Sequence, residues 1–338
     1  MHMPSPTLSS IHDLTISIGE IPILVRTDSR EFAHMLEDRY GKFVTEDAPH
    51  AVMELEIELI PPGRVCDAED VCVRRDAGRW VMERGDFRAE WDPQCHRGWV
   101  RQSANPYAID GVLRILHSLI LAREGGFLVH AASAVRNGRA FLFSGVSGAG
   151  KTTISRLAPP DVALLTDEIS YVRGFRIQDS GFRSQESEVR GTDFGLQIPD
   201  SESRSPSPES QTRRLEPGIE NPKSKIQNRH VLNRQSSIDN RQSFEAFGTP
   251  FAGELARVGE NLHAPLAALY LLAQGPENRI EPVRDAEAAQ GLFRNILFFA
   301  QDAELVPLVF QSVLDFVSRV PVRRLVFAPD ARVWELIT

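Results

Sequence analysis

A glycine-rich segment near the middle of the chain carries residue types that bind phosphate. Gly145–Thr152 has the sequence GVSGAGKT and matches the pattern G-x-x-x-x-G-K-[ST] at every defined position. Glycines let the backbone wrap closely, so that its N–H groups point at phosphate oxygens. The Lys151 ammonium can reach the β- and γ-phosphates, and the Thr152 hydroxyl can hold Mg²⁺. The motif therefore predicts a P-loop that binds ATP with Mg²⁺. The residues expected to contact the nucleotide are Gly145, Ser147, Gly148, Ala149, Gly150, Lys151, Thr152 and Thr153.

A second short segment can supply carboxylates to the same site. Val162–Asp167 is an apolar run that ends in an acid, and Glu168 follows it directly. A strand that ends in an aspartate delivers that acid to magnesium in P-loop enzymes. We expect Asp167 to be a metal ligand beside Thr152, and Glu168 to orient an attacking hydroxyl. Successive side chains of a strand point to opposite faces, so this division of roles requires the strand to end at the pair.

His130 lies in the apolar segment that precedes the P-loop strand. A lone histidine in such a segment is most often packed and hydrogen-bonded without a chemical role. The hairpin predicted here would place His130 beside the P-loop, and we keep it as a candidate catalytic residue together with Lys151, Asp167 and Glu168.

Hydrophobic periodicity indicates the elements that position these residues. Phe127–Val135 and Arg139–Ser144 are predicted strands joined through Asn137-Gly138, the favoured centre of a tight hairpin turn. The second strand leads directly into the P-loop. Tyr107–Arg123 has helical spacing. A short helix is predicted at Thr152–Leu157, which completes a strand–loop–helix arrangement.

The chain is predicted to be α/β, with a smaller β-rich domain at residues 1–105 and a P-loop domain formed by residues 106–177 and 244–338. In the first domain, Ala51–Ile60 and the hairpin Arg79–Trp91 are expected strands, and Ser29–Tyr40 is an expected helix. After residue 244 we expect two strands and two helices. The strands are Leu266–Leu272 and Arg323–Ala328, and the helices are Asp285–Phe299 and Ala303–Val317, with a last helical turn at Ala331–Leu336.

Residues 178–243 differ in composition from the rest of the chain. They are rich in Ser, Arg, Gln, Glu and Pro and contain few large apolar side chains. Such a segment buries too little apolar surface to offset the entropy of ordering. We predict a disordered low-complexity insertion.

Composition limits the classes of partner and location. The formal net charge of -8 over 338 residues argues against a nucleic-acid partner. No apolar run approaches the ~20 residues of a membrane span, and the N-terminal residues have no export-signal pattern. Three cysteines do not make a disulfide framework. A zinc site at Cys66, Cys72, Cys95 and His96 is disfavoured because paired C-x-x-C spacing is missing. A cytoplasmic protein is expected, and a homo-oligomer is compatible with the sequence.

Phe127–Val172 resembles the catalytic core of the HPr kinase/phosphorylase family and, more loosely, ATP-dependent phosphoenolpyruvate carboxykinase. The shared features are a histidine ahead of the P-loop, a Gly-x-Ser-Gly-x-Gly-Lys loop and an acidic pair soon after it. The resemblance extends to Gly248–Glu254 (GTPFAGE) and Ala264–Leu272. HPr kinases have two aspartates where this chain has Asp167 and Glu168.

The resemblance implies a P-loop kinase core and transfer of the ATP γ-phosphoryl group to a hydroxyl, most simply a serine of a protein or peptide. It gives His130 the place of the family's active-site histidine. Lys151 and Thr152 take the places of its phosphate and metal residues, and Asp167 and Glu168 take those of its acids. Two alternatives stay open, namely a small-molecule kinase or carboxykinase-like enzyme, and a nucleotide-binding module without catalysis.

Overall fold

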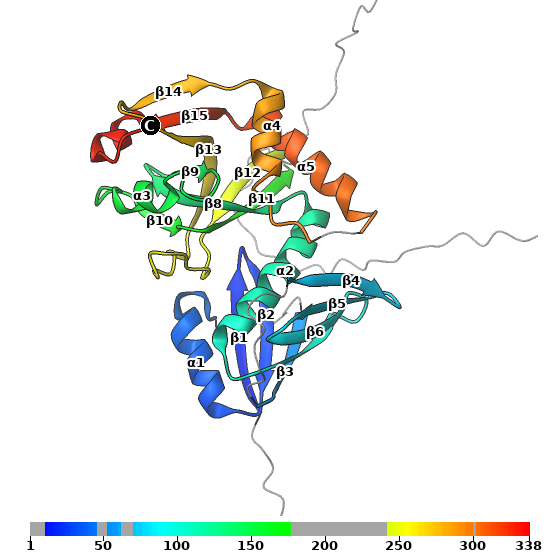
Figure 1. Ribbon diagram of the computed structural model, residues 1–338. Coiled ribbons are helices and arrows are strands. Elements are labelled where there is room, and N and C mark those ends of the chain that lie inside the picture. Colours follow the sequence, from blue (N-terminus) through cyan, green and yellow to red (C-terminus); the bar gives the residue numbers. More distant parts are fainter. Residues whose placement is uncertain (1–10, 46–52, 62–69, 177–241, 300–301) are drawn as a thin grey trace, which may run out of the picture. The chain divides into compact units, whose positions relative to one another are not determined.

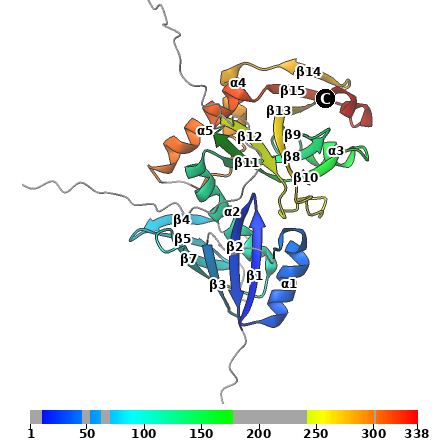
Figure 2. The same cartoon turned by 180° about the vertical axis from the view of Figure 1, so that it is seen from behind.

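Two β-sheets, one in each half of the described chain, are the framework of the protein (Figures 1 and 2). The computed structural model describes residues 11–45, 53–61, 70–176, 242–299 and 302–338. Within them the first sheet has seven strands in the order β1-β2-β3-β7-β6-β5-β4. The second has eight strands in the order β10-β8-β11-β12-β13-β15-β14, with β9 pairing to β13 and β8. The fold is thus mixed α/β, with few helices.

The first sheet is built from the strands β1 (His12–Ile18), β2 (Ile21–Thr27), β3 (Met53–Leu59), β4 (Cys72–Asp76), β5 (Arg79–Arg84), β6 (Phe87–Asp92) and β7 (Arg97–Gln102). Buried residues alternate with less buried ones along β1, β2 and β3, which is the pattern of strands with one face on a core. The predicted helix at residues 29–40 is α1 (Arg30–Tyr40), and the Ser29 hydroxyl accepts the Phe32 N–H at its start. The predicted hairpin at residues 79–91 is confirmed as β5 and β6.

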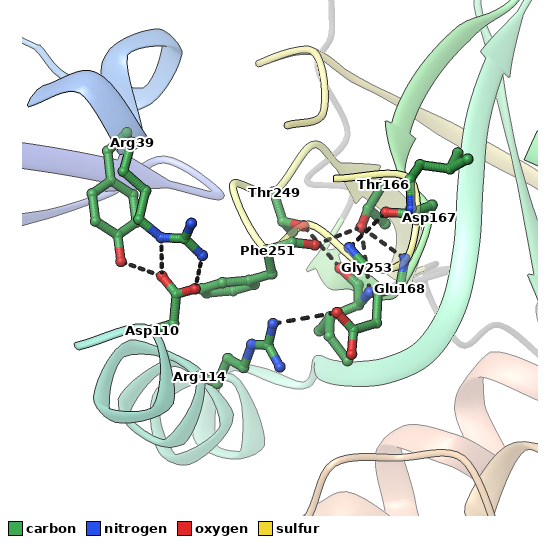
Figure 3. Close-up of polar contacts among 12 residues, drawn as sticks. Arg39, Asp110, Arg114, Thr166, Asp167, Glu168, Thr249, Phe251 and Gly253 are labelled. Atoms are coloured by element: carbon green, nitrogen blue, oxygen red, sulfur yellow. Dashed lines mark hydrogen bonds and ion pairs between the residues drawn. The ribbon is translucent and has the colours of Figure 1, made fainter. Parts of the chain in front are cut away.

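Helix α2 (Pro106–Glu124) contacts both sheets. It begins at the Asn105 cap and ends at Gly125, whose φ of 79° is the left-handed conformation that glycine adopts readily. Its apolar side chains share one core with strands of the first sheet and with Leu128 and Tyr171 of the second. The buried Asp110 carboxylate accepts hydrogen bonds from Arg39 and Tyr40 and so fastens α1 to α2 (Figure 3). Because α2 is apolar on most of its surface, both sheets can bury it.

The second sheet is built from the strands β8 (Phe127–Arg136), β9 (Arg139–Ser144), β10 (Ala163–Thr166), β11 (Ile169–Arg176), β12 (Gln242–Phe247), β13 (His263–Gln274), β14 (Arg279–Pro282) and β15 (Val322–Phe327). The predicted hairpin of β8 and β9 is confirmed, and Asn137 and Gly138 at its turn have φ of 53° and 71°. Strand β9 runs parallel to β13, and β13 runs parallel to β15. The helices of this half are α3 (Lys151–Arg156), α4 (Asp285–Phe293) and α5 (Leu305–Arg319), and a 3-10 helix, η2 (Ala331–Leu336), forms the last turn.

The structure corrects the end of one predicted helix and the end of the predicted insertion. The helix predicted to reach residue 299 ends at Phe293. Beyond it the chain extends along β8, where the His130 N–H donates to the Asn295 carbonyl and the Leu297 N–H to the Leu128 carbonyl. Residues 242 and 243, assigned to the insertion, belong to β12, which pairs with β11. The rest of the predicted insertion lies outside the described residues.

His117 of α2 is fully buried in the core that α2 shares with both sheets. Its Nδ1 lies 3.4 Å from the Tyr171 hydroxyl, and the two rings meet edge to face. Burial lowers the pKa of the imidazole from 6.5 to about 3. The unfolded chain therefore takes up a proton as the pH falls through 6.5, whereas the folded chain resists it down to about 3. The stability that neutral His117 contributes is complete above 6.5 and is lost as the pH falls towards 3.

We predict that His117→Phe flattens this pH dependence, because phenylalanine keeps an aromatic ring on Tyr171 and cannot be protonated. Between about pH 7 and about pH 5, the wild-type free energy of unfolding should fall by about 2 kcal/mol more than that of the variant. Urea denaturation at each pH measures both curves. The comparison uses the change in the free energy of unfolding with pH, so a loss of stability in the variant that is the same at every pH cancels. Parallel curves would contradict the prediction.

Candidate functional site

A cavity of about 470 Å³ gathers most of the residues that the sequence singled out. It brings together residues from the strand β8, the glycine-rich loop, the turn after β10 and the loop after β12. Those that line it are His130, Ser147, Gly148, Gly150, Lys151, Thr152, Thr153, Asp167, Glu168, Ala252, Gly253 and Glu254. Gly145 and Ala149 of the predicted set support the loop and do not line the cavity. Three lining residues, Ala252 to Glu254, were not predicted.

The glycine-rich loop runs from β9 into α3, as the motif requires. Gly148 and Gly150 have φ of 79° and 110°, which side chains with a Cβ rarely tolerate. A Cβ on Gly150 would also lie 2.6 Å from the ring of Phe327. The Gln274 side chain donates to the Gly148 carbonyl at 2.6 Å and holds the loop from β13. Glycine is therefore required at both positions by backbone conformation and, at Gly150, also by the close approach of the Phe327 ring.

The Lys151 ammonium lies over its own loop. Its Nζ donates to the carbonyl oxygens of Gly145 at 2.9 Å and Val146 at 3.4 Å. Burial lowers the pKa of Lys151, and the nearby carboxylates of Glu168 and Glu254 oppose that shift. A cation held by two neutral carbonyls can be attracted away by a stronger anionic partner.

Asp167 fastens the loop that follows β12 to the end of β10. Its side chain is only 5% exposed. The two carboxylate oxygens accept the N–H groups of Gly253 and Leu255, each at 2.9 Å (Figure 3). Strand β10 ends at Thr166, so Asp167 and Glu168 lie in the turn before β11 and are free of the strand's alternation. A division of roles between the two acids required the strand to end before them, and it does.

Thr166 completes this turn. Its hydroxyl accepts the N–H groups of Glu168 and Ile169 and donates to the Phe251 carbonyl (Figure 3). The Thr249 hydroxyl donates to the Ile169 carbonyl from the other side. The loop 249–255 and the acidic turn, residues 166–169, thus each donate a side-chain hydrogen bond to a carbonyl of the other.

Glu254 was missed by sequence reasoning and contacts the predicted metal residue. The Thr152 hydroxyl donates to its Oε2 at 3.1 Å. The two residues are far apart in the sequence, and no spacing rule connects them. The only sequence signal was that Glu254 ends the GTPFAGE segment, which carries part of the resemblance.

Glu168 is half-buried and faces a cation from α2. Arg114 Nη2 lies 3.4 Å from its Oε2 (Figure 3). Burial raises the pKa of Glu168 above its ordinary value of 4.5, while Arg114 acts in the opposite direction. A carboxylate with a raised pKa is a better proton acceptor than an ordinary one. Arg114 was also missed, because one arginine on an apolar helix carries no sequence signal.

His130 lies across the cavity on β8, where it pairs with Ile169 of β11. Burial lowers its pKa below 6.5, and the positive charges of Lys151 and Arg114 lower it further. The imidazole is therefore neutral near neutral pH and can donate from one ring nitrogen and accept at the other.

The disfavoured zinc hypothesis gains no support from the described residues. Cys72 and Cys95 are exposed free thiols, and Cys66 lies outside the described residues. The described part of the chain contains no group of three or more His, Cys, Asp or Glu side chains placed to hold a metal ion.

Comparison with models of known protein families gives no match for this chain, and comparison with curated proteins gives none either. Among the helices of the described residues, none is both long and apolar enough to cross a membrane.

We predict that Gly253→Ala disrupts the cavity although it adds one methyl group. A Cβ at Gly253 would lie 2.9 Å from the Asp167 carboxylate and 2.9 Å from the Glu168 Cβ. The loop must then move away and lose its bonds to Asp167. Thermal unfolding should show a loss of about 1–3 kcal/mol, as is typical of overpacking, and limited proteolysis should cut more readily near residues 249–260. Gly41→Ala is the matched control, since a Cβ there meets nothing within 4 Å. Equal behaviour of the two variants would contradict the prediction.

Proposed function

We propose that this protein is an ATP-dependent phosphotransferase with a P-loop kinase core of the HPr kinase/phosphoenolpyruvate carboxykinase type. It transfers the γ-phosphoryl group of ATP to a hydroxyl, most simply a serine of a protein or peptide. The observation that carries the proposal is the convergence of the P-loop motif with three carboxylates, Asp167, Glu168 and Glu254, in one cavity.

The charges of the cavity suit a nucleotide bound with a divalent cation. Lys151 and the loop amides supply positive partners for phosphate oxygens. Mg²⁺ prefers oxygen ligands, and the Thr152 hydroxyl with the carboxylates of Glu254 and Asp167 offers that donor set. The two N–H bonds that Asp167 accepts leave further lone pairs free, because a carboxylate has about four. The cation would neutralise phosphate charge during transfer.

Glu168 is the residue proposed to handle the proton. Its raised pKa and its place in the cavity allow it to accept the proton of the attacking hydroxyl. Neutral His130, on the opposite strand, can hold that hydroxyl or a phosphate oxygen by a hydrogen bond without adding charge. Lys151 exchanges its carbonyl partners for phosphate oxygens. Catalysis in this class rests mainly on such positioning and charge stabilisation.

Lys151→Met should abolish Mg·ATP binding or weaken it by about a hundredfold or more, because it removes a charge-assisted contact to the phosphates. Isothermal titration measures the affinity, and circular dichroism checks that the fold is kept. Lys42→Met is the matched control, since Lys42 is exposed and pairs with Glu260. Unchanged affinity in a folded Lys151→Met protein would falsify the nucleotide site.

Amide substitutions at the two acids should have unlike effects. Asp167→Asn replaces one accepting oxygen with an NH₂ group that faces a backbone N–H, so both the loop and Mg·ATP affinity should suffer. Glu168→Gln should leave Mg·ATP affinity within a few-fold and lower phosphotransfer by about 10²–10⁴-fold, the usual contribution of a general base.

Transfer of labelled γ-phosphate to candidate acceptors measures the rate, with Glu58→Gln as the control carboxylate remote from the cavity. Equal losses of binding and transfer in the Asp167→Asn and Glu168→Gln variants would contradict the division of roles. Mg·ATP binding with no transfer by the wild type to any acceptor would favour a binding module instead of a kinase.

A further inference from the structure

A second cavity, of about 370 Å³, adjoins the nucleotide cavity. The two share Ala252 as a lining residue. Arg114 lines the second cavity and contacts Glu168, which lines the first. A group bound in the second cavity would therefore lie beside the carboxylate proposed to take the acceptor's proton. Its volume is in the range of small-ligand sites, about 300–1,000 Å³.

The lining of this cavity is basic. Among the described residues it contains Arg39, Arg84 and Arg114 against one acid, Asp110. Two of the three guanidinium groups each donate two hydrogen bonds to a carboxylate. Arg39 donates two hydrogen bonds to Asp110, and Arg84 donates to both oxygens of Asp86 at 2.5 and 2.6 Å.

Arg114 is different. Its one hydrogen bond to a carboxylate of the described residues is the long contact to Glu168 at 3.4 Å. Its Nε is buried and has no hydrogen-bond partner within the described residues. The guanidinium carbon lies 5.0 Å from the centroid of the buried Phe251 ring, which holds the group in place. An arginine has five N–H donors in a fixed fork, and Arg114 lines the cavity with its side chain 24% exposed. Its Nη groups make one long contact to a carboxylate, so a bound oxygen anion can take their remaining donors.

We propose that the second cavity is the acceptor site and that Arg114 binds a carboxylate close to the hydroxyl that is phosphorylated. The inference rests on the proposed phosphotransfer at the P-loop. The acceptor class is a hydroxy acid, either a free molecule or a serine with a carboxylate beside it in a peptide. Leu297 and Phe299, which also line the cavity, would contact its apolar part.

The geometry also gives Arg114 a role in the step itself. When the acceptor carboxylate takes the Arg114 donors, Glu168 is left to the acceptor hydroxyl. The acceptor oxygen then forms a bond to the γ-phosphorus, and the bond from that phosphorus to the β–γ bridging oxygen breaks. ADP leaves with that electron pair, and the hydroxyl proton passes to the Glu168 carboxylate.

Matched acceptors that differ in one charge test the inference. The probes are glycerate against glyceramide, and short peptides with one serine followed by aspartate or by asparagine. Wild-type kcat/KM should favour the acid over its amide by about ten- to hundredfold, as expected for a charge-assisted hydrogen bond. The pair that shows the larger preference distinguishes a free hydroxy acid from a peptide acceptor.

Arg114→Gln should bring the ratio of acid to amide close to one by raising KM for the acid, with Mg·ATP affinity kept. Arg114→Lys keeps the charge without the fork and should retain part of the preference. Arg101→Gln, which removes an exposed arginine paired with Glu58, should keep the wild-type ratio.

Three results would overturn the inference: a wild-type ratio near one, an unchanged ratio in Arg114→Gln, or no phosphorylation of any of these probes by a protein that phosphorylates another acceptor. The first and third need no variant. Failure of the proposed function gives a different signature, because either Mg·ATP binding dependent on Lys151 is missing or no acceptor of any class is phosphorylated.

Discussion

The buried Asp167 carboxylate is the contact on which the arrangement of the site depends. A carboxylate removed from water needs hydrogen-bond donors, and here the amides of Gly253 and Leu255 supply one to each oxygen. The loop after β12 is thereby held at the end of β10. Glu254 then lies opposite Thr152, and Ala252 lies between the two cavities. One buried charge thus brings together segments that are far apart in the chain.

This constraint explains the residue types around Asp167. Gly253 must lack a side chain, because a Cβ would meet both Asp167 and Glu168. Thr166 supplies a hydroxyl that binds both the turn and the loop. Removing a single partner would leave a buried polar group unsatisfied, which costs about 1–3 kcal/mol. We therefore expect the acidic turn and the loop 249–255 to unfold together.

The sequence predicted the local part of this site and missed the part made by tertiary contacts. The glycine-rich loop, the hairpin before it and the end of β10 follow from glycine spacing, Asn137-Gly138 and an apolar run, and all of these signals act over a few residues. Glu254 and Arg114 contact Thr152 and Glu168 only through the folded chain. No periodicity encodes such a contact. The overlong helix prediction at 285–299 failed for the same reason, because the pairing of Ile296 with Val129 overrode local helical spacing.

Helix α2 connects the proposed chemistry to the first sheet. Asp110, one turn before Arg114, accepts from Arg39 and Tyr40 of α1, so the position of α2 is fixed by the N-terminal half. Arg114 projects from the same helix to Glu168 (Figure 3). If the acceptor binds where we propose, the first sheet and α1 set the place of the acceptor, while the second sheet sets the place of the nucleotide. A change in the packing of α1 on α2 would then alter acceptor affinity and leave nucleotide affinity unaffected, because Lys151 and Thr152 belong to a loop and helix held by β9, β13 and β15.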